Sequence, residues 1–248
     1  MLRLLILIGV NIFYINLYGQ TIKIEDIPKG YRIKTPTKTF HYLNEKPDTS
    51  NYGKIATLKG SSSILGKKKI TELFNSFWSK ANYAGANSYI IEKISINDEN
   101  DLQIEMSIYY LNKFELDIDK KLNTKNTIYV FGDIDKKKVK TKIILLNDKR
   151  TELIPYNYIE HENQVGETTT VSIGGLLGSK VWIKWKDQKE STFLSANSFN
   201  IGPYNDIDNI GLSINSGRFY PMNESFGKYL TCVLDKWIEK QKLIEPEK

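Results

Sequence analysis

The chain has 248 residues, of which 40% are hydrophobic and 12% aromatic, so it can bury a sizeable core and does not have the composition of a disordered protein. Its formal net charge of +6 is mild for this length. The charge permits an anionic partner without requiring one, and no motif indicates nucleic-acid binding. The single cysteine, Cys232, excludes an intramolecular disulfide and an N-terminal lipid anchor.

Residues 1–19 have the pattern of a secretory signal peptide. A positive start at Arg3 precedes an apolar run from Leu4 to Phe13, and the small residue Gly19 precedes a polar segment. The run is shorter than the ~20 apolar residues that span a bilayer. We therefore expect export to the periplasm, cell surface or extracellular space, with a retained membrane anchor as the alternative. No later stretch has membrane length, so no integral span is expected after cleavage.

The segment from Thr21 to Asn51 is dotted with proline and lysine and predicts an arm with one short edge strand at Ile22–Ile24. A strand is expected over 54–58, closed by Gly60 and three serines. The next segment, 67–84, carries one apolar stripe at helical spacing and ends at Gly85. The stripe consists of Ile70, Leu73, Phe74, Phe77, Trp78 and Ala81.

A β-hairpin is expected next, from a strand over 88–96, a polar turn and a strand over 102–110. In the second strand apolar and polar residues alternate, which predicts one buried and one wet face. The buried set is Leu102, Ile104, Met106, Ile108 and Tyr110. The local order is therefore β-α-β-β.

The corner between this helix and the following strand carries Ala81, Gly85, Ala86 and Asn87, followed by Ser88-Tyr89-Ile90-Ile91. Over 54–110 the chain thus resembles the YbjQ-type putative heavy-metal-binding fold. The resemblance implies a fold but no metal ligand, because the segment from Lys54 to Tyr110 contains neither Cys nor His.

Between Leu111 and Asn126 the composition becomes charged, which indicates a domain boundary, although Phe114, Leu116 and Ile118 alternate and could extend a strand. The remainder predicts short strands of a sandwich or barrel, a glycine- and asparagine-rich loop over 200–223, and a closing helix over 225–242. The strands are expected at 127–131, 138–146, 152–158, 168–173, 180–185 and 191–195. The expected fold class is α+β, with a β-α-β-β domain over 20–115 and a β-rich domain with a terminal helix over 126–248.

Catalytic and metal motifs are weak. The two histidines, His41 and His161, do not have the spacing of a zinc site, and neighbours in Glu160-His161-Glu162 point in opposite directions on a strand. Ser225 and Lys228 match a Ser-x-x-Lys pair, but Ser225 is expected to be a helix N-cap. The sequence therefore predicts no catalytic residue, no metal and no cofactor, without excluding an enzyme.

Other sequence features also favour structural interpretations. Cys232 is expected to be a half-exposed structural thiol. The glycines from Gly174 to Gly178 precede a strand, which favours a hairpin turn over a phosphate loop. The acidic turn from Asp98 to Asp101 is expected to be solvated and not to bind calcium.

The binding candidates are an outward tryptophan and two sets of lysines. Alternation over Val181–Trp185 places Trp182 and Lys184 on one face, where an indole can stack on a sugar ring or anchor a partner. The alternative, which the sequence favours, is that a second layer such as the terminal helix covers this tryptophan. Lys138, Lys140 and Lys142 form the basic row that we expect to assist it.

The leading hypothesis is an exported, non-catalytic binding or interaction protein whose partner is an envelope protein or an anionic glycan. A secreted hydrolase acting on glycans or peptides and a subunit of a surface or secretion assembly are the alternatives.

Overall fold

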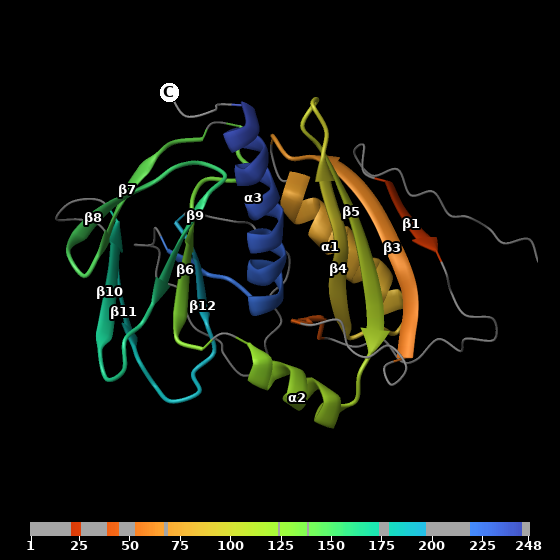
Figure 1. Ribbon diagram of the computed structural model, residues 1–248, viewed down its shortest axis with the longest axis horizontal. Coiled ribbons are helices and arrows are strands. Elements are labelled where there is room, and N and C mark those ends of the chain that lie inside the picture. The colour runs from red at the N-terminus through yellow and green to blue at the C-terminus, as the bar shows by residue number, and fades with distance from the viewer. Residues whose placement is uncertain are drawn as a thin grey trace, which may run out of the picture.

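The computed structural model describes residues 21–25, 39–44, 53–66, 69–123, 125–137, 139–173, 179–196 and 219–244. The predicted α+β class is confirmed, with a terminal helix and no closed barrel in the described sheets (Figure 1). The expected signal segment, the glycines at 174–178 and Lys138 lie outside the described residues. Within the described ranges, no helix has both the length and the hydropathy to cross a membrane.

The N-terminal half is built on a five-stranded sheet with the order β1-β3-β5-β4-β2. Its strands are β1 (Thr21–Glu25), β2 (His41–Tyr42), β3 (Gly53–Ser63), β4 (Ser88–Ile96) and β5 (Asp101–Tyr110). Helices α1 (Lys69–Tyr83) and α3 (Glu224–Ile244) cover one face of this sheet (Figure 1).

Both predicted apolar helices are confirmed. In α1, five of the six stripe residues are buried and Trp78 is partly buried against them. The helix ends before Gly85, whose φ of 77° lies in the left-handed region that glycine adopts at least cost. In α3 the buried stripe includes Phe226, Tyr229 and Val233.

Strand β3 extends beyond the predicted 54–58 to Ser63, because β1 and β5 pair with both of its edges over the serines. Gly60 therefore lies inside the strand and does not close it. A Cβ at Gly60 would lie 2.7 Å from the ring of Phe77, so this glycine allows α1 to approach the sheet closely.

The alternation in β5 is confirmed on its inner face, where Leu102, Ile104, Met106 and Ile108 are buried and Tyr110 is partly buried. On the outer face Ser107 and Tyr109 are also buried, although a wet face was expected. A small cluster of Leu43, Ile90, Tyr109 and Leu111 covers this end of the sheet, with Leu116 packed against it.

The C-terminal half is a sandwich of two four-stranded sheets, with orders β11-β10-β7-β8 and β13-β12-β6-β9. Its strands are β6 (Thr127–Phe131), β7 (Lys142–Leu146), β8 (Lys149–Leu153), β9 (Tyr158–Glu162), β10 (Thr168–Ile173), β11 (Lys180–Lys184), β12 (Thr192–Ser195) and β13 (Tyr220–Pro221). Alternate residues of β6 enter two different cores: Ile128 and Val130 lie between the sheets, while Tyr129 and Phe131 face the main core.

Three predicted elements of this half are wrong. The strand expected over 152–158 is two strands, β8 and β9, because Pro155 cannot donate a ladder hydrogen bond and the chain crosses there from one sheet to the other. The strand expected from Lys138 begins at Lys142. At the charged boundary, the strand that Phe114, Leu116 and Ile118 could have extended is instead a helix, α2 (Lys113–Leu122), whose N-terminus has a capping box between Asn112 and Glu115.

The main core crosses the expected domain boundary. It joins residues of the five-stranded sheet, both long helices and the inner sandwich sheet, and α3 lies between the two halves (Figure 1). Asp135, in the loop after β6, accepts hydrogen bonds from the Ile70 and Thr71 amides at 2.8 and 2.6 Å and so caps α1. The two halves therefore share both apolar packing and a helix cap.

Candidate functional site

Trp182 lies in the middle of β11, an edge strand of the outer sandwich sheet. Its side chain is 65% exposed, while its neighbour Ile183 is buried in the sandwich core. Lys180 and Lys184 occupy the same outward face, and the Lys180 Nζ lies 5.9 Å from the centre of the indole ring. The strand thus presents one large aromatic ring beside two cations.

Basic charge continues across the sheet from this tryptophan. Strand register aligns Lys180 with Ser172, Ser172 with Leu145, and Leu145 with Arg150, so these residues share the outward face. We call the exposed set of Trp182, Lys180, Lys184 and Arg150 the Trp182 face. Its shape is that of a sheet surface, which suits an extended or planar ligand better than an enclosed one.

The carbonyls of β11 are partly occupied by side chains. Asn163 Nδ2 donates to the Ile183 carbonyl at 2.9 Å, and Lys189 Nζ donates to the Lys184 carbonyl at 3.2 Å. The Ile183 carbonyl lies on the side of β11 that pairs with β10, as the Ser179 carbonyl and the Trp185 amide do, so of these two donors only Lys189 covers a carbonyl on the open edge.

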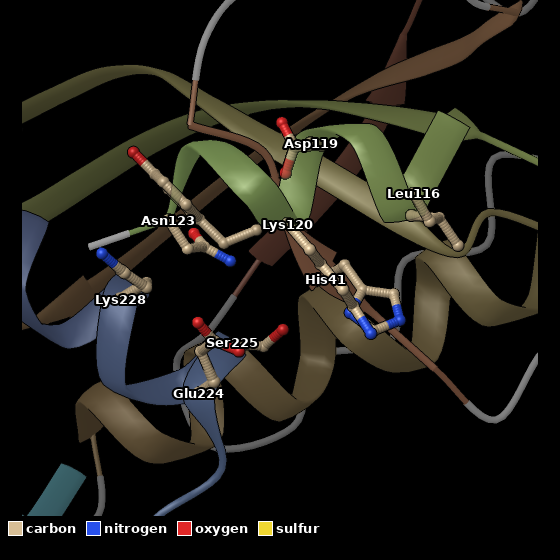
Figure 2. A pocket seen from close by; sticks show the side chains of 9 residues that line it. His41, Leu116, Asp119, Lys120, Asn123, Glu224, Ser225 and Lys228 are labelled. Carbon is tan, nitrogen blue, oxygen red and sulfur yellow. The ribbon is translucent and has the colours of Figure 1, made fainter. Parts of the chain in front are cut away.

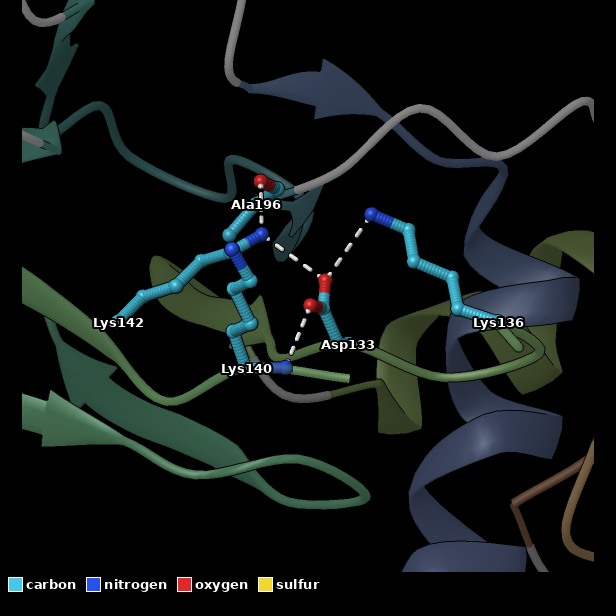
Figure 3. Close-up of polar contacts among 5 residues, drawn as sticks. All are labelled: Asp133, Lys136, Lys140, Lys142 and Ala196. Atoms are coloured by element: carbon cyan, nitrogen blue, oxygen red, sulfur yellow. Dashed lines mark hydrogen bonds and ion pairs between the residues drawn. The ribbon is translucent and has the colours of Figure 1, made fainter. Parts of the chain in front are cut away.

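The structure divides the predicted basic row. Lys142 turns inward, where its Nζ donates to Asp133 Oδ1 at 2.9 Å and to the Ala196 carbonyl at 3.1 Å (Figure 3). Lys140 is exposed, and its backbone amide donates to Asp133 Oδ2 at 3.0 Å. Lys136 Nζ lies 3.1 Å from the same carboxylate. Lys142 thus fixes the loop that contains Asp133, and its ammonium group is not part of a row of exposed lysines.

The electrostatics of Asp133 follow from these contacts. Burial by itself would raise the pKa of its carboxyl group, but the hydrogen bonds from Lys142, Lys136 and the Lys140 amide lower it below the ordinary aspartate value. A charged, buried aspartate surrounded by lysines is a structural arrangement here, because it ties the loop after β6 to β7 and to the end of β12.

A small pocket, with a cavity of about 10 Å³, lies where β2, α2 and the first turn of α3 meet (Figure 2). Its lining is polar and comes from residues far apart in the sequence. The lining residues are His41, Tyr42, Leu116, Asp119, Lys120, Asn123, Glu224, Ser225 and Lys228.

Burial and neighbouring charges shift the pKa of four of these groups. Burial and then the Cys232 thiol raise the pKa of Tyr42. Burial and then Glu190 raise the pKa of Glu224, and burial lowers the pKa of Lys228 although Glu224 opposes that change. Burial and Lys120 lower the pKa of His41. Glu224 Oε1 is buried without a hydrogen-bond partner in the described structure. Such desolvated groups occur at functional sites and also in structural ion networks.

The Ser-x-x-Lys pair is not arranged for nucleophilic chemistry. The Ser225 hydroxyl donates to the Phe40 carbonyl. The expectation that Ser225 caps α3 is wrong, because the Asn223 side chain accepts from the Ser225 amide at 2.8 Å and is therefore the cap. Asn223 has the residue type of a cap, so the sequence already contained this signal.

The other chemical candidates are also occupied structurally. The Cys232 thiol is half-buried, lies 3.6 Å from the Tyr42 hydroxyl, and has a pKa raised by burial, which makes it a poor nucleophile. Glu160 accepts from the Tyr129 hydroxyl, while His161 contacts Thr169 in the other direction. The described ranges contain no cluster of three or more metal-ligating side chains.

A wide, shallow hollow of about 320 Å³ lies on the outer face of the five-stranded sheet. Several of the charged side chains that line this hollow pair with one another, because Lys59 forms ion pairs with Glu25 at 2.7 Å and with Glu105 at 3.7 Å. These pairs are exposed and contribute little to stability.

No protein-family model matches this chain, and no curated protein matches it. Among solved structures, the chain is similar to the Francisella virulence factor FvfA with a TM-score of 0.27 and 17% identity, over 36% of this chain and 97% of that chain. A TM-score this low carries no argument about function, and the YbjQ-type resemblance stays a prediction.

Proposed function

We propose that the protein is an exported, non-catalytic binding protein that uses the Trp182 face to hold an anionic glycan of the cell envelope. The single observation that supports this function is the exposed indole on a sheet face beside Lys180 and Lys184. A sugar ring stacks on an indole through its apolar face, while lysines attract carboxylate or phosphate substituents. Export is supported by the signal-like pattern of residues 1–19.

The pocket at the junction supports a hydrolase less well. Glycoside hydrolysis requires two carboxyl groups that flank one bond, with the pKa of one of them raised. Glu224 has a raised pKa and Asp119 is a second carboxyl group of the lining, but Asp119 accepts hydrogen bonds at 3.3 Å from the Asn44 backbone amide and side chain, which is a structural role. The cavity of about 10 Å³ holds about one water molecule and is too small for a sugar ring.

The binding test compares a soluble acidic polysaccharide, polygalacturonate, with neutral dextran by titration calorimetry and tryptophan fluorescence. We expect wild-type protein to bind the acidic polymer, and Trp182→Ala to weaken binding at least tenfold. Tyr83→Ala is the matched control, because Tyr83 is an aromatic residue on α1 that is 70% exposed. Lys184→Gln should reduce the salt dependence of binding.

If wild-type protein and Trp182→Ala bound the acidic polysaccharide with equal affinity, the Trp182 face would not be the binding surface. Wild-type binding to neither polymer, together with reproducible crosslinking to one envelope protein, would favour the assembly alternative.

Export is tested separately by fractionating cells that express the full chain. A mature protein beginning at Gln20 outside the cytoplasm is the expected result, and an uncleaved membrane-bound chain would indicate an anchor.

A further inference from the structure

Helix α2 exposes an apolar row to solvent. Phe114, Ile118 and Leu122 are 72%, 40% and 53% exposed, and their spacing of four residues places them along one side of the helix. In Figure 1 the helix lies at the end of the molecule where the two halves meet. An exposed row of three large apolar side chains on a ten-residue helix is typical of a contact surface.

The orientation of α2 is determined by contacts on its other side. Leu116 packs against the cluster at the end of the five-stranded sheet, and Asp119 accepts hydrogen bonds at 3.3 Å from the Asn44 backbone amide and side chain. The capping box between Asn112 and Glu115 secures the first turn. Rotation of the helix to bury the apolar row would break these contacts, so the row points outward in the folded protein.

A charged row runs beside the apolar one. Lys113, Asp117 and Lys121 are exposed and are also spaced by four residues. Two copies of α2 packed in parallel would place each charge against its own like charge. Packed antiparallel about a point beside Ile118, each Asp117 instead lies about 3 Å along the axis from Lys121 of the partner subunit, and the same distance from Asp117 of the partner subunit. This arrangement gives two close pairs of opposite charge and one of like charge. Charge complementarity therefore selects the antiparallel arrangement.

We propose that two copies of this chain associate through α2, with the helices antiparallel across a two-fold axis beside Ile118. In this arrangement Phe114 packs against Leu122 of the partner subunit, and Ile118 packs against Ile118 of the partner subunit. The same surface thus serves both copies, as two-fold symmetry requires. One short helix buries less than the ~1,000 Å² of a stable interface, so the association is weak and depends on concentration.

Engineered cysteines test the geometry, in a Cys232→Ser background of the full chain with copper-phenanthroline as oxidant. Ile118→Cys should form a covalent dimer. Phe114→Cys should not, because antiparallel helices place the two positions about 12 Å apart along the axis, beyond the reach of a disulfide. Crosslinking of both single variants would indicate a parallel arrangement, and crosslinking of neither would indicate that α2 is not the contact; either result overturns the proposal.

Sedimentation over a hundredfold concentration range tests the energetics. Ile118→Glu should weaken dimerisation at least tenfold, while Leu243→Glu should not, although Leu243 is 84% exposed. Asp117→Lys should also weaken dimerisation, and adding Lys121→Asp should restore it. A wild-type protein that is monomeric throughout, or equal effects of both glutamate variants, would overturn the proposal. So would a monomer that binds phosphatidylglycerol vesicles through Ile118, since that would assign the row to a lipid surface.

Discussion

Gly227 determines how closely α3 approaches the inner sandwich sheet, and Gly227→Ala tests that contact. A Cβ at this position would lie 2.3 Å from Cδ1 and 2.5 Å from Cγ of Phe193. Carbon atoms in favourable contact are about 3.5–4.0 Å apart, so the ring or the helix would have to move by more than 1 Å. The ring cannot retreat easily, because Phe193 is stacked on Tyr129 at 4.8 Å with an angle of 5° between the rings.

Two effects of this substitution oppose each other. Alanine is favoured over glycine inside a helix by about 1 kcal/mol. Overpacking a well-packed core costs about 1–3 kcal/mol, and a clash with an immobile ring belongs at the upper end of that range. We therefore expect Gly227→Ala to lower the free energy of unfolding by about 1–2 kcal/mol.

The assay is urea denaturation of the full chain followed by circular dichroism, with the midpoint compared at constant m-value. Gly53→Ala is the matched control, because a Cβ at Gly53 would meet nothing within 4 Å. In a Phe193→Leu background the cost of Gly227→Ala should fall by at least about 1 kcal/mol, which a double-mutant cycle measures. If Gly227→Ala were stabilising, the gain in helix propensity would exceed the cost of overpacking. That result would refute the inferred close contact between α3 and Phe193.

Three further perturbations follow from the structure. Asp135→Ala should destabilise the protein by about 1–2 kcal/mol through loss of the α1 cap, and Asp135→Asn should cost less; equal effects in chemical denaturation would argue against capping. Asp133→Asn should be destabilising at pH 7. Because the folded pKa of Asp133 is lowered, its stabilisation is present above the ordinary value of 3.8 and is lost as pH falls through the folded value. The difference from wild type in thermal unfolding should therefore shrink towards pH 3. Trp182→Ala should change the unfolding midpoint little, because the indole is exposed, and a large change would mean that the ring supports the fold.

Periodicity predicted the elements whose buried residues follow one repeat. The stripe of α1 and the alternation of β5 each continue without interruption, so helix and strand could be recognised from spacing alone. The outward direction of Trp182 followed from the same reasoning, since Ile183 beside it is buried. The sequence favoured a second layer covering the indole, and this part of the prediction was wrong because the ring is 65% exposed.

Elements whose apolar residues do not share one buried face were harder to predict. In α2, Leu116 faces the sheet while Phe114 and Ile118 face solvent, and the resulting alternation resembles a strand. The capping-box pattern of Asn112 and Glu115 was the signal that could have identified the helix.

The junction pocket could not have been found from sequence patterns. His41 and Lys228 belong to distant segments and meet only because α3 returns to the five-stranded sheet. The inward turn of Lys142 was equally hidden, because it depends on Asp133, a residue of another loop. No local spacing encodes either arrangement.

The cap that Asp135 provides has a consequence for the order in which the chain folds. The carboxylate lies 65 residues after the first amide it caps, so α1 leaves the ribosome without its cap. Its sheet also lacks α3, the last described helix, which supplies Phe226 and Tyr229 to the same core. An uncapped helix with an unfilled core is marginal in water. The N-terminal half therefore completes its structure only after the end of α3 has been synthesised.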